Sequence, residues 1–510
     1  KKIVELTKID HQKDFVGYTR YLMAIMGSIG LAIVYGFKVN VSIAIVAMVN
    51  HTAIKSAAGH TNSTVSALNI FFQSQDGPFE WSESVQGLIL SSYFWGYILT
   101  QLPGGRVAEL FSARWVMNGS IVLNAVASIL SPWFAQLHYS LFIVMRITQG
   151  LGGGVTFPAM HVMIAKWAPP DERSILSSIV YAGTALGTVI SIIVSGLLAG
   201  NLGWAAVFYV EGALSLIWCV GWAFLVQDSP EQQTRFITQG EKDYIASSLG
   251  QDQDKTVPWG QVLRSLPFWA ILISHLCSNF GWYMLLTELP TFMNQILKFT
   301  LSAMPFLCMW FFTMSLGKIL AIIQSKGWIS ISISRKIGTI FASFVPMVCL
   351  IGVSYVGCNR ALAVVLMTIG VTCIGGMFCG FLTNHIDIAP NFAGTLVAIT
   401  NTVATIPGFI VPPFVGRAKT LLSQFKRYIF SHMNGGRFCY LFSGTAVLPT
   451  GKFLPDSSPA FEDVTVPIES KETGRKDFQG DEAGRKDFPV GKTAFCSPTI
   501  SSKIGLHVDV

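Results

Sequence analysis

The chain consists mainly of long apolar runs separated by short polar segments. A helix needs about 20 apolar residues to cross a hydrocarbon core of about 30 Å. Runs of that length occur at 21–49, 84–104, 115–136, 138–165, 174–200 and 204–226, and again at 267–297, 302–324, 337–357, 361–383 and 392–416. The pattern predicts an all-α membrane protein with about eleven transmembrane helices.

A polar stretch at 227–266 divides these runs into a group of six and a group of five. Two halves of six helices joined by a long central loop are typical of transporters built from repeats, so a two-half helical bundle is expected. Its parts are an N-terminus (1–20), a six-helix half (21–226), a central cytoplasmic loop (227–266), a five-helix half (267–416) and a tail (417–510).

The tail departs from this layout. Polar and charged residues interrupt every apolar stretch after about 420, so we expect no twelfth helix. The polar composition further on predicts disorder. An alternative exon or an incorrect gene model would explain such a tail, and so would simple divergence of a terminus.

Composition supports a membrane protein and argues against other classes. Of the 510 residues, 51% are hydrophobic and only 12% are charged, whereas soluble proteins average about 25% charged residues. The nine cysteines show no CxxC or Cys/His spacing, so neither a metal centre nor a disulfide framework is expected. The predicted helices carry no paired carboxylates and no nucleophile motif, so we expect neither an enzyme nor a bound cofactor.

Basic residues explain the net charge of +7 and orient the chain. Cytoplasmic loops of membrane proteins carry an excess of Lys and Arg, and if the spans alternate, the basic residues here fall on one side. They are Lys1, Lys2, Lys8, Lys13, Arg20, Arg106, Arg114, Lys166, Arg173, Lys326, Arg335 and Lys336. The N-terminus is therefore predicted to be cytoplasmic, and nucleic acid is not an expected partner. Asn62, in the first outer loop, is the expected glycosylation site.

Two cations lie inside predicted helices. Arg146 is the only permanently charged residue from Leu141 to Ala165, and an arginine at a helix centre costs roughly 3 kcal/mol on insertion scales. At 1.5 Å per residue, Lys38 lies about 16 Å and Arg146 about 12 Å below the outer end of their helices. This shared depth predicts an anion-binding site in a central cavity. The alternative is that each side chain snorkels to the surface.

Other polar residues are candidates for coupling or for lining the cavity. His161 lies roughly on the face of Arg146, beyond a kink expected at Pro158. It either titrates as a proton-coupling group or is a buried histidine bonded to a backbone carbonyl. The further candidates are Asn40, Gln149 and Tyr283.

Several glycines and prolines predict helix contacts and breaks. The GxxxG pairs at 150/154 and 183/187 predict close helix packing. Pro407 and Gly408 predict a breakable helix suited to rocking or gating.

The segment 103–114 (PGGRVAELFSAR) resembles the loop between helices two and three of the major facilitator superfamily. Gly105, Glu109 and Arg114 fall on its gating motif. Glu109, Leu110 and Ser112 stand where the family carries an aspartate, a basic residue and a second glycine, so the charge is kept and the tight turn is not assured.

Longer segments are similar to one subfamily, the anion/phosphate cotransporters, which include sialin, the sodium-phosphate cotransporters and the vesicular glutamate transporters. They are 94–105 (FWGYILTQLPGG), the stretch around Arg146 and 166–174 (KWAPPDERS). The segment 274–286 (SHLCSNFGWYMLL) is most similar to the insect inorganic phosphate cotransporters.

The resemblance implies roles for individual residues. Arg146 matches the substrate-binding arginine of the fourth helix, and Lys38 replaces the arginine of the first helix, keeping the charge without the two-pronged fork. Gly153 stands where sialin and the glutamate carriers have a proton-coupling glutamate. Leu90 and Ser278 replace a histidine and an arginine of the glutamate carriers, which disfavours vesicular glutamate transport.

The sequence thus predicts a secondary active transporter of inorganic phosphate or small organic anions, working by alternating access and driven by sodium or the membrane potential. A proton-coupled organic-anion carrier is the alternative in the same class, and a truncated isoform that does not transport is the alternative in another. The expected partners are the anion, Na+ or H+ as coupling ion, and membrane lipid. We expect a monomer in the plasma membrane or in a vesicular or lysosomal membrane.

Overall fold

The computed structural model describes residues 17–50, 77–249, 257–296, 303–356 and 360–408. The predictions for Asn62, for the missing twelfth helix and for the tail 417–510 lie outside these residues.

Every predicted apolar run coincides with one helix or with a broken pair of helices. The first half contains α2 (Thr19–Met48), α4 (Glu83–Val107), α5 (Ala113–Leu137), α6 (Tyr139–Gly154), α7 (Thr156–Trp167), α8 (Arg173–Leu202) and α9 (Trp204–Leu225). The central loop carries α10 (Gln239–Leu249) and α11 (Trp259–Arg264). The second half contains α12 (Leu266–Ile296), α13 (Met304–Ser325), α14 (Ile331–Tyr355), α15 (Arg360–Ile374), α16 (Phe381–Ile388) and α17 (Ala393–Thr405).

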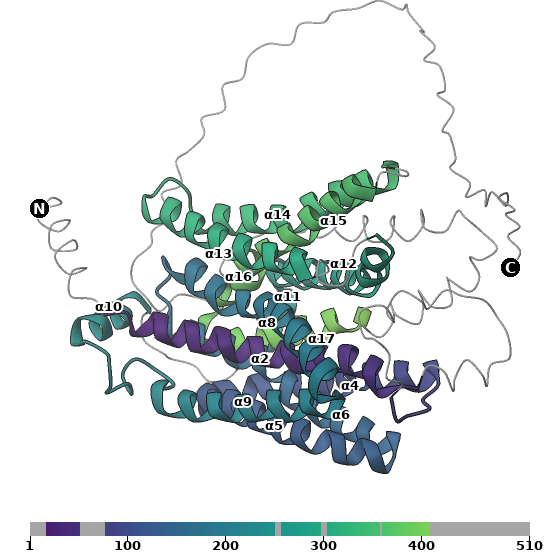
Figure 1. The fold of residues 1–510 in the computed structure, drawn as a ribbon. Helices are drawn as coiled ribbons and strands as arrows, with labels where there is room; N and C mark the ends of the chain where they lie inside the picture. Colours follow the sequence, from purple (N-terminus) through teal and green to yellow (C-terminus); the bar gives the residue numbers. More distant parts are fainter. Residues whose placement is uncertain (1–16, 51–76, 250–256, 297–302, 357–359, 409–510) are drawn as a thin grey trace, which may run out of the picture.

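The two halves lie against each other with their long helices running in similar directions (Figure 1). Within the first half α2 packs on α8, α4 on α6, and α5 on both α6 and α9. Between the halves, α8 contacts α13, while α4 and α7 contact α17. We call the end of the bundle beside α10, where α2 begins, the basic end.

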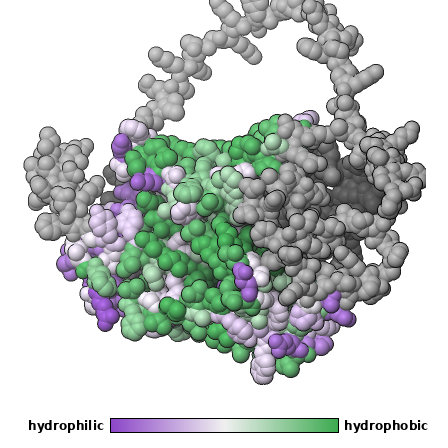
Figure 2. Space-filling model, in the orientation of Figure 1, coloured by the Kyte–Doolittle hydropathy of each residue, from purple (hydrophilic) through white to green (hydrophobic). Residues whose placement is uncertain are grey.

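The outer surface of the bundle suits a lipid environment. In Figure 2 hydrophobic residues cover the middle of the visible face and hydrophilic residues gather toward its sides. Exposed apolar side chains on this perimeter include Leu99, Ile217, Phe224 and Val348. Among the described residues, seven helical stretches are long and apolar enough to cross a membrane, and one of them, Ser84–Leu137, contains both α4 and α5.

Serine side chains fix where several helices begin. Ser82, Ser112 and Ser330 precede α4, α5 and α14, and each hydroxyl accepts a hydrogen bond from the backbone N–H three residues later. Such a cap satisfies one of the four N–H groups that a helix start leaves unpaired. The start of α14 at Ile331 lies six residues before the predicted run, because Ser330 and not hydropathy sets it.

The expected kink at Pro158 is wrong. The helix breaks at Val155, after the three glycines that end α6, and Thr156 begins α7. Pro158 is the third residue of α7, and a proline there loses no hydrogen bond because the first turn of a helix has no acceptor for its N–H groups. The glycines, which weaken a helix, and not the proline, interrupt this span.

The expected run 361–383 is also divided. α15 ends at Ile374, a short 3-10 turn covers Gly375–Phe378, and α16 then extends to Ile388. A Cβ on Gly375 would meet the Thr313 hydroxyl of α13. Close packing against α13 therefore explains the glycine that breaks the span.

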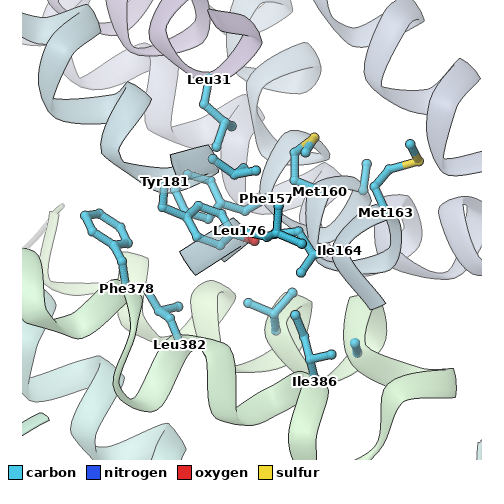
Figure 3. Packing of buried hydrophobic residues seen from close by; sticks show 14 of the residues in the cluster. Leu31, Phe157, Met160, Met163, Ile164, Leu176, Tyr181, Phe378, Leu382 and Ile386 are labelled. Atoms are coloured by element: carbon cyan, nitrogen blue, oxygen red, sulfur yellow. The ribbon is translucent and has the colours of Figure 1, made fainter. Parts of the chain in front are cut away.

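Apolar side chains fill the contact between the halves. Figure 3 shows Phe157 and Tyr181 of the first half near Phe378 and Leu382 of the second. The rings of Phe157 and Tyr181 stack with centroids 5.4 Å apart, and those of Tyr181 and Phe378 stack at 5.7 Å. An aromatic stack thus extends from α7 and α8 across to Phe378 of the second half.

The predicted GxxxG contacts are present. A Cβ on Gly150 or Gly154 would collide with the carbonyl of Tyr93 or Tyr97 on α4. A Cβ on Gly187 would collide with the backbone of Ala32, which brings α2 and α8 into direct backbone contact. Glycine allows this approach because it has no side chain to separate the helices.

We predict that Gly187→Ala lowers stability by about 1–3 kcal/mol, the usual cost of overpacking, because α2 and α8 must separate. Gly196→Ala is the matched control, since it lies on the same helix and a Cβ there meets nothing within 4 Å. The unfolding temperature of the purified protein measures both. Equal unfolding temperatures for the two variants would show that the α2–α8 contact is not tight.

Candidate functional site

A cavity lies between the two halves. Its lining comes from α2, α4, α7 and α8 of the first half and from α12, α13 and α17 of the second, with residues between α15 and α16 closing one side. The polar or aromatic lining residues are Tyr35, Lys38, Tyr97, Thr184, Thr188, His275, Asn279, Trp282, Tyr283 and Asn401. Of the residues predicted to bind substrate or line a cavity, Lys38 and Tyr283 lie in this lining.

Lys38 is surrounded by aromatic rings. Its Nζ lies 4.8 Å from the ring centre of Phe94, 5.2 Å from those of Tyr35 and Tyr97, and 5.6 Å from that of Tyr283. Ring faces attract a cation, so the ammonium group is held inside the bundle. Among the described residues no carboxylate forms an ion pair with it. An anion entering the cavity therefore meets a lysine without a counter-charge.

Arg146 lies behind the cavity wall. Only 1% of this residue is exposed, and it is absent from the lining. Its Nη1 donates to the carbonyl of Phe37 at 2.9 Å and to Oε1 of Gln149 at 2.6 Å. Its guanidinium lies 5.1 Å from the ring centre of Tyr93. These contacts stabilise the charge within the protein, so in this conformation Arg146 does not snorkel to the surface.

Tyr93 and Tyr97 connect the two cations. Their rings stack with centroids 6.0 Å apart, Tyr93 lying under Arg146 and Tyr97 under Lys38. The carbonyl that Arg146 binds also belongs to the residue next to Lys38. The two predicted cations thus belong to one connected cluster, with Lys38 in the cavity and Arg146 behind it.

Buried donors without acceptors surround Arg146. Arg146 Nε, Gln149 Nε2 and the Tyr93 hydroxyl have no hydrogen-bond partner among the described residues. The Tyr93 hydroxyl lies against Gly153, where any side chain would collide with it. A buried donor left unpaired costs about 1–3 kcal/mol, so an acceptor placed here would be bound favourably.

The basic end is closed by a buried ion cluster. Asp387 of α16 accepts a hydrogen bond from Arg335 Nε at 2.6 Å and from Arg173 Nη1 at 3.1 Å. Arg173 begins α8 in the first half, while Arg335 lies on α14 in the second. Arg335 also donates to the hydroxyl of Ser174 at 2.6 Å. A single carboxylate therefore joins the two halves.

Glu109 makes a second contact between the halves. Its carboxylate accepts hydrogen bonds from the backbone N–H and the hydroxyl of Thr395, both at 2.6 Å, in the first turn of α17. A carboxylate is stabilised at a helix N-terminus by the helix dipole and the free N–H groups. Gly105 lies beside it, where a Cβ would come within 2.7 Å of the carbonyl of Gly394.

Arg114, the third residue of the predicted gating motif, contacts α9 and the start of the central loop. Its side chain donates to the carbonyl of Ala223 on α9 and to Gln227 Oε1 at 2.6 Å, and its backbone N–H donates to Asp228 Oδ1 at 2.9 Å. No tight turn forms between α4 and α5: residues Ala108–Ser112 make a single π-helical turn that continues both helices. Ser112, which stands in place of the glycine, has an extended backbone and caps the start of α5.

A hydrogen-bonded chain of histidines starts at the cavity. His275, a lining residue, lies 3.2 Å from the hydroxyl of Thr400 through its Nδ1, and that hydroxyl lies 2.8 Å from Nε2 of His385. Nδ1 of His385 lies 2.8 Å from the carbonyl of Leu382. The sequence analysis did not select His275 or His385, because only the fold brings α12, α16 and α17 together.

His161 lies next to this chain and outside the cavity lining. Its Nδ1 is within hydrogen-bond distance of the Tyr181 hydroxyl at 2.5 Å and of the Phe157 carbonyl at 3.0 Å, and its Nε2 lies 3.2 Å from the carbonyl of Leu382. A neutral ring that donates from Nε2 and accepts from Tyr181 satisfies both nitrogens. The bond to Leu382 connects α7 to α16, and hence the two halves.

Glu211 is a candidate that the sequence analysis missed. It lies on α9, and its carboxylate accepts hydrogen bonds from Asn40, Ser191 and Ser195. Asn40, predicted to serve coupling or line the cavity, therefore faces α9. The available signal was that Glu211 is the single charged residue in the run 204–226.

Comparisons with known proteins agree with this architecture. The family model for the Major Facilitator Superfamily matches residues 27–412. The chain belongs to the Major Facilitator Superfamily. It is 41% identical to sialin of Homo sapiens over 404 residues, which are 77% of this chain and 81% of that protein.

Other members are nearly as similar. A Drosophila melanogaster protein named "Putative inorganic phosphate cotransporter" is 39% identical over 84% of each chain. Vesicular glutamate transporter 2 of Homo sapiens is 34% identical over 78% of this chain and 68% of that one. Among solved structures, the E. coli fucose:proton symporter has a TM-score of 0.57 at 12% identity and covers 84% of this chain and 98% of its own. That likeness shows the fold.

We predict that Asp387→Asn opens the basic end, because removing one partner of a buried ion cluster leaves uncompensated charge at a cost of about 3–5 kcal/mol. Cys379 reports the opening: it is fully buried, and its carbonyl accepts from Arg335. Alkylation of Cys379, located by peptide mass spectrometry, should be faster in the variant than in the wild type. Asp243→Asn, at an exposed position of α10, is the control, and equally slow alkylation in both variants would contradict the prediction.

Proposed function

We propose that the protein is a secondary active transporter of inorganic phosphate or a small organic anion, driven by sodium or by the membrane potential. The observation that carries this proposal is Lys38, a cavity-lining cation with aromatic neighbours and no carboxylate partner among the described residues. The relatives named for inorganic phosphate and glutamate support an anionic substrate.

In this proposal the anion binds first to Lys38 and draws on the donors around Arg146. The guanidinium offers Nε, while Tyr93 and Gln149 add a hydroxyl and an amide. Hydrogen bonds to a charged group are worth about 1.5–3 kcal/mol each. A small anion loses its hydration on entering the cavity. A few such bonds offset that loss only if the cavity closes around the anion. Tyr93 and Tyr97 lie between the cations, so their side chains would be the first to move.

In this proposal, alternating access would use the contacts at the basic end. Asp387 and Glu109 each join the halves there through a few directional contacts, whereas apolar side chains such as Tyr181 and Phe378 meet in the middle of the interface. Separation of these two contacts would open the cavity toward the basic end by rocking of the halves. With the N-terminus on the cytoplasmic side, as the positive-inside bias predicts, this is the inward-open state.

A proton-coupled carrier is the second candidate, favoured by the chain from His275 through Thr400 to His385. His275 meets the cavity, so a proton taken up there could pass along the chain as the cavity changes its access. Anion uptake into proteoliposomes, measured while sodium and pH are varied independently, distinguishes the two: a dependence on an inward sodium gradient at constant pH supports the first.

We predict that Lys38→Gln lowers anion uptake by about tenfold or more, since it removes a charged hydrogen bond of about 1.5–3 kcal/mol. Uptake of phosphate, glutamate, sialate and urate is measured for the full-length protein in proteoliposomes. Lys318→Gln is the matched control, because Lys318 lies on a spanning helix, α13, but is exposed. Unchanged uptake in Lys38→Gln would remove Lys38 from the substrate site.

We further predict that Arg146→Lys impairs uptake although the charge is kept. Lysine cannot contact Phe37 and Gln149 while also presenting a second planar donor. Arg146→Lys should therefore raise the anion concentration for half-maximal uptake. A variant with wild-type concentration dependence would show that Arg146 acts only as a structural residue.

A further inference from the structure

Glu211 lies in a group of oxygen atoms where α2, α8 and α9 meet. Its Oε2 accepts from Asn40 Nδ2 at 2.8 Å, and its Oε1 accepts from the hydroxyls of Ser195 at 2.9 Å and Ser191 at 3.2 Å. The Ser191 hydroxyl also lies 3.2 Å from the carbonyl of Gly36. We call these five residues the Glu211 cluster.

The cluster has no cationic side chain. None of the ion pairs of the described residues includes Glu211. Both carboxylate oxygens accept hydrogen bonds from neutral groups, which is the arrangement that suits an ionised carboxylate. A carboxylate inside spanning helices is costly without a positive partner. The geometry therefore leaves one negative charge without a counter-charge.

A second observation also indicates a missing cation. Asn40 is fully buried, and its Oδ1 has no hydrogen-bond partner in the part of the chain that the structure describes. Buried amide oxygens are nearly always paired. The same amide group contacts Glu211 through Nδ2, so the unpaired oxygen belongs to the cluster. An unsatisfied acceptor beside an uncompensated carboxylate calls for a positive ligand.

We propose that the Glu211 cluster binds one sodium ion. Hard cations take oxygen ligands, and the cluster supplies the carboxylate, two hydroxyls, the Gly36 carbonyl and the Asn40 amide oxygen. An ion with ligands at about 2.4 Å, within the range for calcium, places adjacent octahedral ligands about 3.4 Å apart. The Ser191 hydroxyl lies 3.4 Å from that of Ser195 and 3.2 Å from Glu211 Oε1. A single carboxylate balances one positive charge, which selects a monovalent ion.

The site is placed to act on the anion cavity through α2. Gly36 and Asn40 are four residues apart and lie on one face of this helix, whereas Lys38 is between them and faces the other side. Sodium would fix α2 against α8 and α9 and thereby set the position of Lys38. The effect of sodium on Lys38 rests on the proposed anion transport, whereas sodium binding itself does not.

The test measures the unfolding temperature of the purified full-length protein in detergent, with sodium chloride varied against choline chloride at constant ionic strength and pH. A ligand that binds only the folded state stabilises it progressively with concentration. The wild type should show a sodium-dependent rise that choline does not give. Glu211→Gln should abolish the rise, and Glu231→Gln, at an exposed loop position, should keep it.

A milder variant guards against misfolding of Glu211→Gln. Ser195→Ala removes one ligand and should raise the sodium concentration for the half-maximal shift by roughly tenfold. An equal rise in choline, a full sodium response in both Glu211→Gln and Ser195→Ala, or a response to pH in place of sodium would overturn the proposal. The last result would assign the cluster to a proton.

The Lys38→Gln variant separates this site from the proposed function. If it loses anion uptake but keeps the sodium-dependent rise, the cation site stands apart from the anion site. If no anion is taken up by the wild type while the rise persists, the proposed function fails and the sodium site is supported. If uptake depends on sodium and the rise is absent from the wild type, the Glu211 cluster is not the sodium site.

Discussion

A charge among apolar helices must be satisfied by the protein, because hydrocarbon supplies neither counter-charge nor hydrogen bonds. The charged residues of the bundle meet this constraint in different ways. Arg146 binds a backbone carbonyl and a glutamine, Lys38 lies among aromatic rings, and Asp387 binds two arginines. These arrangements differ in how completely each charge is paired. Asp387 is paired with two arginines, whereas Lys38 and Glu211 are partnered by neutral groups among the described residues, so each could bind a ligand of opposite charge.

The full pairing of Asp387 suits a contact that must form and break. A buried ion cluster adds little net stability compared with apolar packing, yet it becomes strongly unfavourable when one partner is lost. It therefore favours one defined closed arrangement over slightly displaced ones. Elsewhere the halves meet through apolar side chains, including the stacked rings of Tyr181 and Phe378, and through close helix contacts such as that of Gly317 with Ser178. In the proposed function, loss of the ion cluster at the basic end would allow the halves to rock apart there.

Hydropathy predicted the spanning helices well, because the lipid requires every span to be apolar. Apolar runs placed the spanning helices of the described residues but not α10 and α11 of the central loop, and GxxxG spacing identified real backbone contacts such as Gly187 with Ala32. The kink was misplaced because proline is harmless in the first turn of a helix, where it lies. For the site, the cost of burying charge pointed to Lys38 and Arg146. Glu211 went unnoticed although the same reasoning applied to it. No sequence pattern joined His275 to His385, whose rings come together only in the fold, where both lie beside Thr400.

In the proposed function, charge balance would give a physical reason for coupling an anion to a sodium ion. Lys38, Arg146 and Glu211 together carry a net positive charge in the first half. A monovalent anion alone or a sodium ion alone changes that net charge by one unit, and each change alters the cost of moving the site through a low-dielectric interior. When both are bound the net charge equals that of the empty protein. In this proposal, sodium bound alone would raise the net charge further and make the rocking step costly, whereas a bound anion would offset the charge that sodium adds. Because α2 carries residues of both sites, each ligand also favours the binding of the other, and by linkage the effect is equal in both directions.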